Sequence, residues 1–170
     1  MRAVILAIAG MLALMPAPAG WAGEEVALTS KAMVLLDQGK EDEALELLRQ
    51  AKRATPNDPI VHLNYASVLF YRGKDLIEAG KNTQGRMLFK EVQRELELTM
   101  TLADDSADGR AIKGQCAFLL GDTALYAFED SEQATMWYEK SLEYNPAQEH
   151  VARALAKLKQ PAPPTGSATH

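Results

Sequence analysis

The sequence predicts an all-α protein, and three observations support this fold class. The chain has 170 residues, of which 47% are hydrophobic and 24% charged, as is typical of one modest globular domain. Apolar residues recur at intervals of three and four, the spacing of one helix face. No proline lies between Ile60 and Asn145, so nothing in that stretch forbids long helices. We therefore expect a series of consecutive helices.

The first two helices are expected over residues 25–38 and 41–54. Starting at Leu28, apolar residues of the first helix recur at i+4, i+7 and i+8, and Gly39 then interrupts the pattern. The second helix has acidic residues in its first turn and basic residues towards its end, an order that suits the helix dipole. Pro56 marks its end.

The third helix is expected to begin at Pro59, with Asp58 as its cap. Its end has two solutions, because either Gly73 or Gly80 can close it. The longer helix is favoured, since residues 81–85 form the stronger turn signal.

The rest of the chain predicts four more helices. A polar loop is expected at residues 104–109, and a turn capped by Ser131 follows later. The last helix has a single apolar side, which is typical of a helix that caps a stack. The predicted ranges are 86–103, 110–128, 132–144 and 147–159.

Residues 1–22 have the pattern of a cleavable secretory signal. Arg2 precedes the uncharged apolar stretch 3–15, and cleavage after Ala19 or after Ala22 fits the small-residue rule. The alternative is an uncleaved membrane anchor, although the stretch is shorter than the roughly 20 residues of a spanning helix. No cysteine lies near the cleavage region, which excludes a bacterial-type lipid anchor there.

The expected domain is therefore residues 23–159, followed by a Pro- and Ala-rich tail at 160–170 whose composition predicts disorder. The formal net charge is −5, and it becomes −6 when Arg2 leaves with the signal. Such an acidic chain is a poor partner for nucleic acid or anionic lipid. We expect export to a periplasm, with secretion or anchoring by an uncleaved signal as the alternatives.

Residues able to carry chemistry are few. Cys116 is the single cysteine and lies in an apolar helical stretch, which predicts a buried small hydrophobe. His62, His150 and His170 show no metal-ligand spacing, and His62 is expected to pack between hairpins. The sequence contains neither a phosphate-binding loop nor a nucleophile motif. We therefore predict no metal, no cofactor and no catalytic activity.

Two segments share one pattern of small and large apolar residues that ends in proline. They are GKEDEALELLRQAKRATP at residues 39–56 and EDSEQATMWYEKSLEYNP at residues 129–146. Both resemble the second helix of the tetratricopeptide repeat (TPR), and Leu120-Gly121 resembles the signature of its first helix, one residue out of step. The resemblance covers about residues 25–158 and suggests a TPR protein of the exported, bacterial periplasmic type.

The resemblance implies a superhelical stack of three antiparallel hairpins plus a capping helix. Pro56 and Pro146 lie 90 residues apart, whereas two repeats of about 34 residues would place them about 68 apart. We assign the excess to elongated central helices. Close helix approach is expected at the small residues Ala44, Ala51, Ala134 and Ser141, with Leu48 and Tyr138 filling the space between hairpins.

In such repeats the first helix of each hairpin commonly lines a peptide groove. Asn64 resembles an asparagine that holds the backbone of a bound peptide in peptide-binding members. Basic residues are sparse on this side, so we do not predict a clamp for a terminal carboxylate. The resemblance assigns to the groove Met33, Leu36, Asp37, Asn64, Ser67, Tyr71 and Ala124.

These features predict a non-catalytic adaptor or assembly factor. It would bind a peptide segment or surface of another envelope protein, with no nucleic-acid partner and no membrane span in the mature chain. The alternative is a self-associating structural scaffold of the cell envelope, which would form a homo-oligomer.

Overall fold

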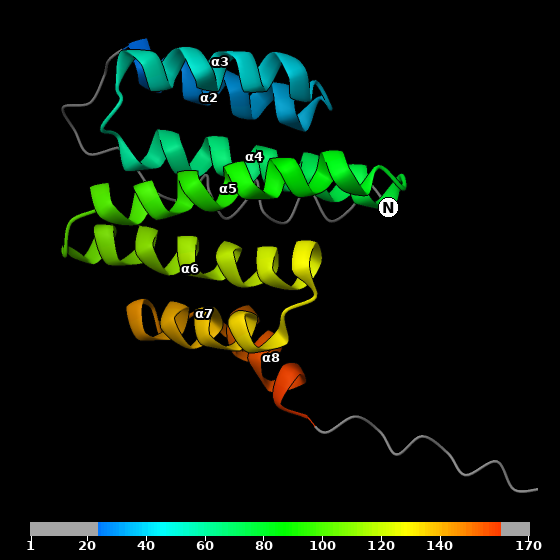
Figure 1. The fold of residues 1–170 in the computed structure, drawn as a ribbon. Helices are drawn as coiled ribbons and strands as arrows, with labels where there is room; N and C mark the ends of the chain where they lie inside the picture. The colour runs from blue at the N-terminus through cyan, green and yellow to red at the C-terminus, as the bar shows by residue number, and fades with distance from the viewer. Residues whose placement is uncertain (1–23, 161–170) are drawn as a thin grey trace, which may run out of the picture.

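The structure is a computed structural model that describes residues 24–160, and every regular element within this range is a helix. The predicted signal and all of the predicted tail except residue 160 lie outside the described residues. Figure 1 shows the helices stacked in successive layers, most of them lying roughly parallel to one another. Their bounds are α2 (Glu24–Asp37), α3 (Glu41–Ala54), α4 (Pro59–Glu78), α5 (Asn82–Leu102), α6 (Ala107–Phe128), α7 (Ser131–Tyr144) and α8 (Glu149–Lys159).

Consecutive helices pack as antiparallel neighbours. The hairpins are α2 with α3, α4 with α5, and α6 with α7, and α8 packs on α7 (Figure 1). The hairpins join through the pairs α3–α4 and α5–α6, and α4 also contacts α6 directly. The predicted all-α, TPR-like stack is therefore confirmed.

The central helices are elongated, as the spacing of the two prolines predicts. α4, α5 and α6 have 20, 21 and 22 residues, whereas α2, α3 and α7 have 14 each. None of the helices in residues 24–160 combines the length and the apolar character that crossing a membrane requires.

The longer of the two predicted ends for α4 is correct. Gly73 lies inside the helix, where a Cβ atom would stand only 3.2 Å from the ring of Phe89 on α5. Gly73 therefore permits close packing and does not end the helix. The end comes at Glu78, and Gly80 then takes φ +76°, a conformation that favours glycine.

The predicted turn at residues 81–85 is wrong, because α5 already begins at Asn82. The chain has already reversed its direction at Lys81, whose backbone N–H donates to the carbonyl of Leu76 at 2.8 Å. Gly85 lies in the first turns of α5, and a Cβ atom there would stand 2.8 Å from the carbonyl oxygen of Gly73. This glycine serves helix contact and not the turn.

The starts of α6 and α7 also differ from their predicted positions. α6 begins at Ala107, inside the predicted loop, because the Ser106 hydroxyl accepts a hydrogen bond from the backbone N–H of Gly109 at 3.0 Å. The cap of α7 is Asp130 and not Ser131, since its carboxylate accepts from a backbone N–H three residues later at 2.9 Å.

The final helix has the predicted capping role, although it begins at Glu149 instead of Ala147. The side chain of Asn145 accepts from the backbone N–H of Ala147 at 3.2 Å, which extends the turn by two residues. Val151 is fully buried, and the remaining apolar residues of α8 pack beside it against α7. These residues are Ala154, Leu155 and Leu158.

The predicted small residues lie in the core between the helices. All four are fully buried, as are Leu48 and, to within 1%, Tyr138. One core cluster runs from α2 to α6, and a smaller one joins α6, α7 and α8. The ring of Tyr138 lies over Gly121, where a Cβ atom would stand 2.4 Å from the ring.

A polar cluster joins the first hairpin to the second. The ring nitrogens of His62 lie 2.7 Å from the Glu95 carboxylate and 2.9 Å from the carbonyl oxygen of Pro56. The Lys52 ammonium pairs with the same carboxylate at 2.5 Å. His62 is buried, so its predicted position between hairpins is confirmed.

Candidate functional site

The three residues predicted on α4 share one face of that helix. Asn64, Ser67 and Tyr71 follow each other at intervals of three and four residues. Asn64 is 5% exposed, and its side-chain oxygen has no hydrogen-bond partner in the described chain. The Ser67 hydroxyl donates to the carbonyl of Leu63 at 2.8 Å, so its hydrogen is already used.

Tyr71 packs against the larger core cluster, which includes residues of α4 and α6. Its ring is half-buried and meets the ring of Phe70 edge-on at 5.5 Å. Burial, followed by the nearby charge of Asp122 on α6, raises the pKa of Tyr71 to about 12. The charge of Asp122 on α6 therefore acts on Tyr71 of α4.

The predicted residues of α2 lie on a separate helix. Met33 and Leu36 are half-buried, Leu36 packs against the larger core cluster, and Asp37 is exposed. Among the described residues, no hydrogen bond or ion pair links these three side chains to α4.

Ala124, the residue predicted on α6, lies in the core. It is 0% exposed and belongs to the smaller core cluster with Ala134 and Tyr138. Its contact with a partner stays a prediction.

Asp122 is the main residue that the sequence prediction missed. It is partly exposed, and its carboxylate accepts a hydrogen bond from the Tyr138 hydroxyl at 2.5 Å. Burial raises the pKa of Asp122 to about 6, whereas the Tyr138 hydrogen bond and the charge of Lys74 act in the opposite direction. One signal was available, since Asp122 is the single charged residue between Lys113 and Glu129.

Near their C-terminal ends, α4 and α6 contact each other through Lys74, Glu78 and Tyr126. Lys74 lies 3.7 Å from the Glu78 carboxylate and 5.2 Å from the centre of the Tyr126 ring. The Tyr126 hydroxyl lies 3.4 Å from Glu78. We call the set formed by α4 and α6 the α4–α6 face, and its members are Asn64, Ser67, Tyr71, Lys74, Asp122 and Tyr126.

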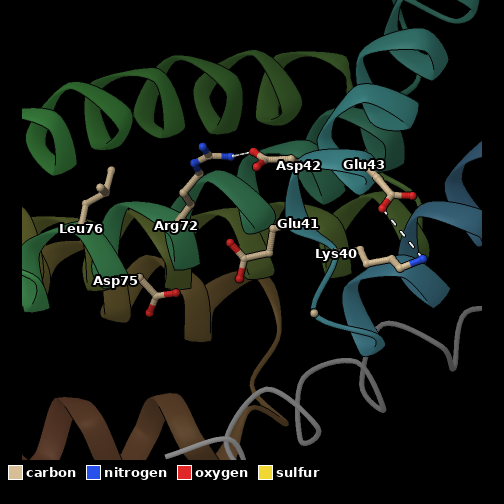
Figure 2. Close-up of a pocket in the computed structure, with 8 residues that line it drawn as sticks. Lys40, Glu41, Asp42, Glu43, Arg72, Asp75 and Leu76 are labelled. Carbon is tan, nitrogen blue, oxygen red and sulfur yellow. Dashed lines mark hydrogen bonds and ion pairs between the residues drawn. The ribbon is translucent and has the colours of Figure 1, made fainter.

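An open pocket of about 550 Å³ lies where the α2–α3 turn meets α4. Figure 2 shows the ion pairs Arg72–Asp42 and Lys40–Glu43 at its edge. Burial, together with the charge of Asp75, raises the pKa of Glu41. Most charges around the pocket are thus paired with each other, and it is lined by Gly39, Lys40, Glu41, Asp42, Glu43, Arg72, Asp75 and Leu76.

The single cysteine behaves as its sequence context predicts. Cys116 is fully buried, and this burial raises the pKa of its thiol to about 12, so the reactive thiolate is strongly disfavoured. In residues 24–160, no group of three or more His, Cys, Asp or Glu side chains is placed to hold a metal ion.

Comparison with known proteins agrees with this architecture. The model of the family described as "Tetratricopeptide repeat" matches residues 25–68. The first TPR of Spaghetti (RPAP3), solved with the HSP90 peptide SRMEEVD, has a TM-score of 0.57 at 21% identity, and the match covers 79% of this chain and 90% of that one. The fold is TPR-like.

A second TPR structure gives the same result. The first TPR domain of human RPAP3 has a TM-score of 0.56 at 22% identity, with 79% of this chain and 88% of that one covered. No match was found among curated proteins. The TPR-like fold suggests a protein–protein interaction module, and such folds are generally not catalytic.

Proposed function

We propose that this protein is a non-catalytic adaptor or assembly factor that binds a peptide segment of another protein along the α4–α6 face. The observation that carries the proposal is the Asn64 side-chain oxygen, which is buried without a partner on that face. Such an atom gains stability when a donor reaches it, and the N–H of a peptide backbone is a suitable donor. The peptide bound to the TPR of Spaghetti supports this type of ligand.

A peptide-display library panned on the full chain tests the proposal. The wild-type chain is expected to enrich peptides, and a variant with Asn64→Ala and Tyr71→Ala is expected to lose them while keeping its helical circular dichroism. The matched control replaces Lys90 and Glu97 with Ala, because both are exposed on α5 and their side chains form no hydrogen bond or ion pair with the residues that the structure describes. Equal enrichment by all three chains would move the site elsewhere.

We also propose that the partner resides in the cell envelope and that the chain is exported to the periplasm. The basis is the apolar stretch at residues 3–15 behind Arg2. Expression in a Gram-negative host, with fractionation and mass measurement of the mature N-terminus, tests this. An unprocessed chain in the cytoplasm would contradict export, and an unprocessed chain in the membrane would favour anchoring.

The alternative role, a self-associating scaffold, has a weaker basis. In the part of the chain that the structure describes, the large hydrophobic residues that remain exposed are Val34, Met87, Leu98, Tyr126, Phe128 and Met136, and they are distributed over four helices. Single exposed apolar residues are ordinary on a protein surface. Size measurement at several concentrations separates the two roles, because a scaffold grows with concentration and an adaptor stays monomeric.

A further inference from the structure

Asp122 holds a carboxylate whose charge the described residues compensate only weakly. No Lys, Arg or His nitrogen in the described chain lies within 4.0 Å of it, the limit for an ion pair. Its hydrogen-bond partner is the neutral hydroxyl of Tyr138 on α7. The nearby cation, Lys74 on α4, pairs with Glu78 instead. An ionised carboxylate with this little compensation is unfavourable in a partly buried position.

The side chains around Asp122 suit a cation that arrives from outside. Tyr71 lies close enough for the Asp122 charge to affect its ionisation, and Tyr126 follows Asp122 by one helical turn. Aromatic rings attract ammonium and guanidinium groups, and the Tyr126 ring already has the Lys74 ammonium near it. The long apolar stem of a lysine or arginine would pack against such rings while its charged end reaches the carboxylate.

Charge favours a basic ligand over an acidic one at this face. The basic residue of α4 in this face, Lys74, is already paired with Glu78. An acidic peptide that used Lys74 would have to break this pair, whereas a basic side chain at Asp122 breaks none. The whole chain also carries a formal charge of −5, which attracts basic segments over longer distances.

We propose that Asp122 receives a lysine or arginine side chain of the bound peptide, beside the ring of Tyr126 one helical turn away. This inference rests on the proposed function, because it requires a peptide on the α4–α6 face. It adds the chemical class of the residue that the peptide must contain and the carboxylate that recognises it.

A panned random heptapeptide library provides the probe. Peptides enriched on the wild-type chain are expected to share Lys or Arg at one fixed position. One such peptide is then synthesised together with a copy in which that residue is norleucine if it is Lys, or citrulline if it is Arg. Either copy keeps most of the stem and loses the charge, and it is expected to bind at least about tenfold more weakly.

A double-mutant cycle locates the contact. Asp122→Asn is expected to weaken the basic peptide by a similar factor and to leave binding of the uncharged copy nearly unchanged. Glu97→Gln removes the same charge from an exposed position of α5 and is expected to change neither affinity by more than about twofold.

The outcomes separate the two proposals. Enriched peptides without a preferred basic position, or equal binding of the charged and uncharged peptides, would overturn the role of Asp122 and leave peptide binding intact. Enrichment of no peptide by the wild-type chain would overturn both. The comparison of the two peptides uses the unaltered protein, so it is decisive even if the Asp122→Asn chain does not fold.

Discussion

Two partly buried carboxylates of this protein have opposite surroundings. Glu95, where the first hairpin meets the second, accepts Lys52 and His62 within 2.7 Å or less. Asp122, on the α4–α6 face, has the Tyr138 hydroxyl and no ion-pair partner in the described chain. Both carboxylates are held by neighbouring helices, but only Glu95 has its charge compensated. The difference indicates that Glu95 stabilises the contact between the two hairpins, whereas burial disfavours the ionised form of Asp122.

The largest expected effect is the loss of the compensated carboxylate. Glu95→Ala leaves Lys52 and His62, both largely buried, without their shared acceptor. We expect the free energy of unfolding to fall by about 2–3 kcal/mol. Urea unfolding at neutral pH measures this change. Glu97→Ala is the control, with an expected change within about 0.5 kcal/mol. A similarly small change for Glu95→Ala would contradict a stabilising role of Glu95 and remove its difference from Asp122.

Removing the charge of Asp122 is expected to raise the free energy of unfolding, whereas the loss of Glu95 lowers it. Its folded-state pKa of about 6 lies above the ordinary value of 3.8, so folding disfavours the ionised form. This penalty is fully present above the folded pKa and disappears as the pH falls towards the unfolded value. At pH 7.5, Asp122→Asn should therefore stabilise the protein by about 1–2 kcal/mol.

The pH profile sharpens this second prediction. The difference in unfolding free energy between Asp122→Asn and the wild type should shrink steadily between pH 7 and pH 4.5, because the wild-type carboxyl group becomes protonated. Urea unfolding across this range measures it, and groups common to both chains cancel. A variant that is less stable than the wild type at every pH would show that Asp122 supports the fold.

The smallest expected effect concerns the Tyr138 hydroxyl, which donates a hydrogen bond to Asp122. Tyr138→Phe removes the hydrogen bond that lowers the pKa of Asp122, and it should destabilise the fold by about 1 kcal/mol at pH 8. The loss should be smaller at pH 5, where Asp122 is largely protonated. Thermal unfolding at both pH values distinguishes this from a pure packing effect, which would be the same at each.

Much of the fold could be predicted from the sequence because local chemistry determines it. The bounds of α3 agree with the prediction, since an acidic first turn and Pro56 define its two ends. The length of the central helices followed from the spacing of two prolines. The starts of α5 and α6 were missed, because glycine was interpreted as a turn signal. Gly85 in fact lies at a helix–helix contact, which a single sequence does not distinguish from a turn.

The candidate site could be predicted only in part. Asn64, Ser67 and Tyr71 share a face because they lie on one uninterrupted helix, whose periodicity is visible in the sequence. On α6 the predicted residue was Ala124, which is buried in the smaller core cluster, whereas Asp122 two residues earlier is partly exposed. Two residues correspond to about 200° around a helix, and the Leu120-Gly121 pair was already one residue out of step. The orientation of α6 is instead set by Gly121 against Tyr138, a contact distant in sequence.

The unequal lengths of neighbouring helices have a consequence for recognition. α4 has 20 residues and α3 has 14, so α4 is longer than α3 by about 9 Å. The end of α4 therefore extends past the first hairpin (Figure 1). If an extended peptide binds along α4, about three more of its residues can contact this helix than can contact a helix of the length of α3. The number of peptide residues that the protein contacts then depends on the length of one helix. A longer helix increases this number without an additional repeat.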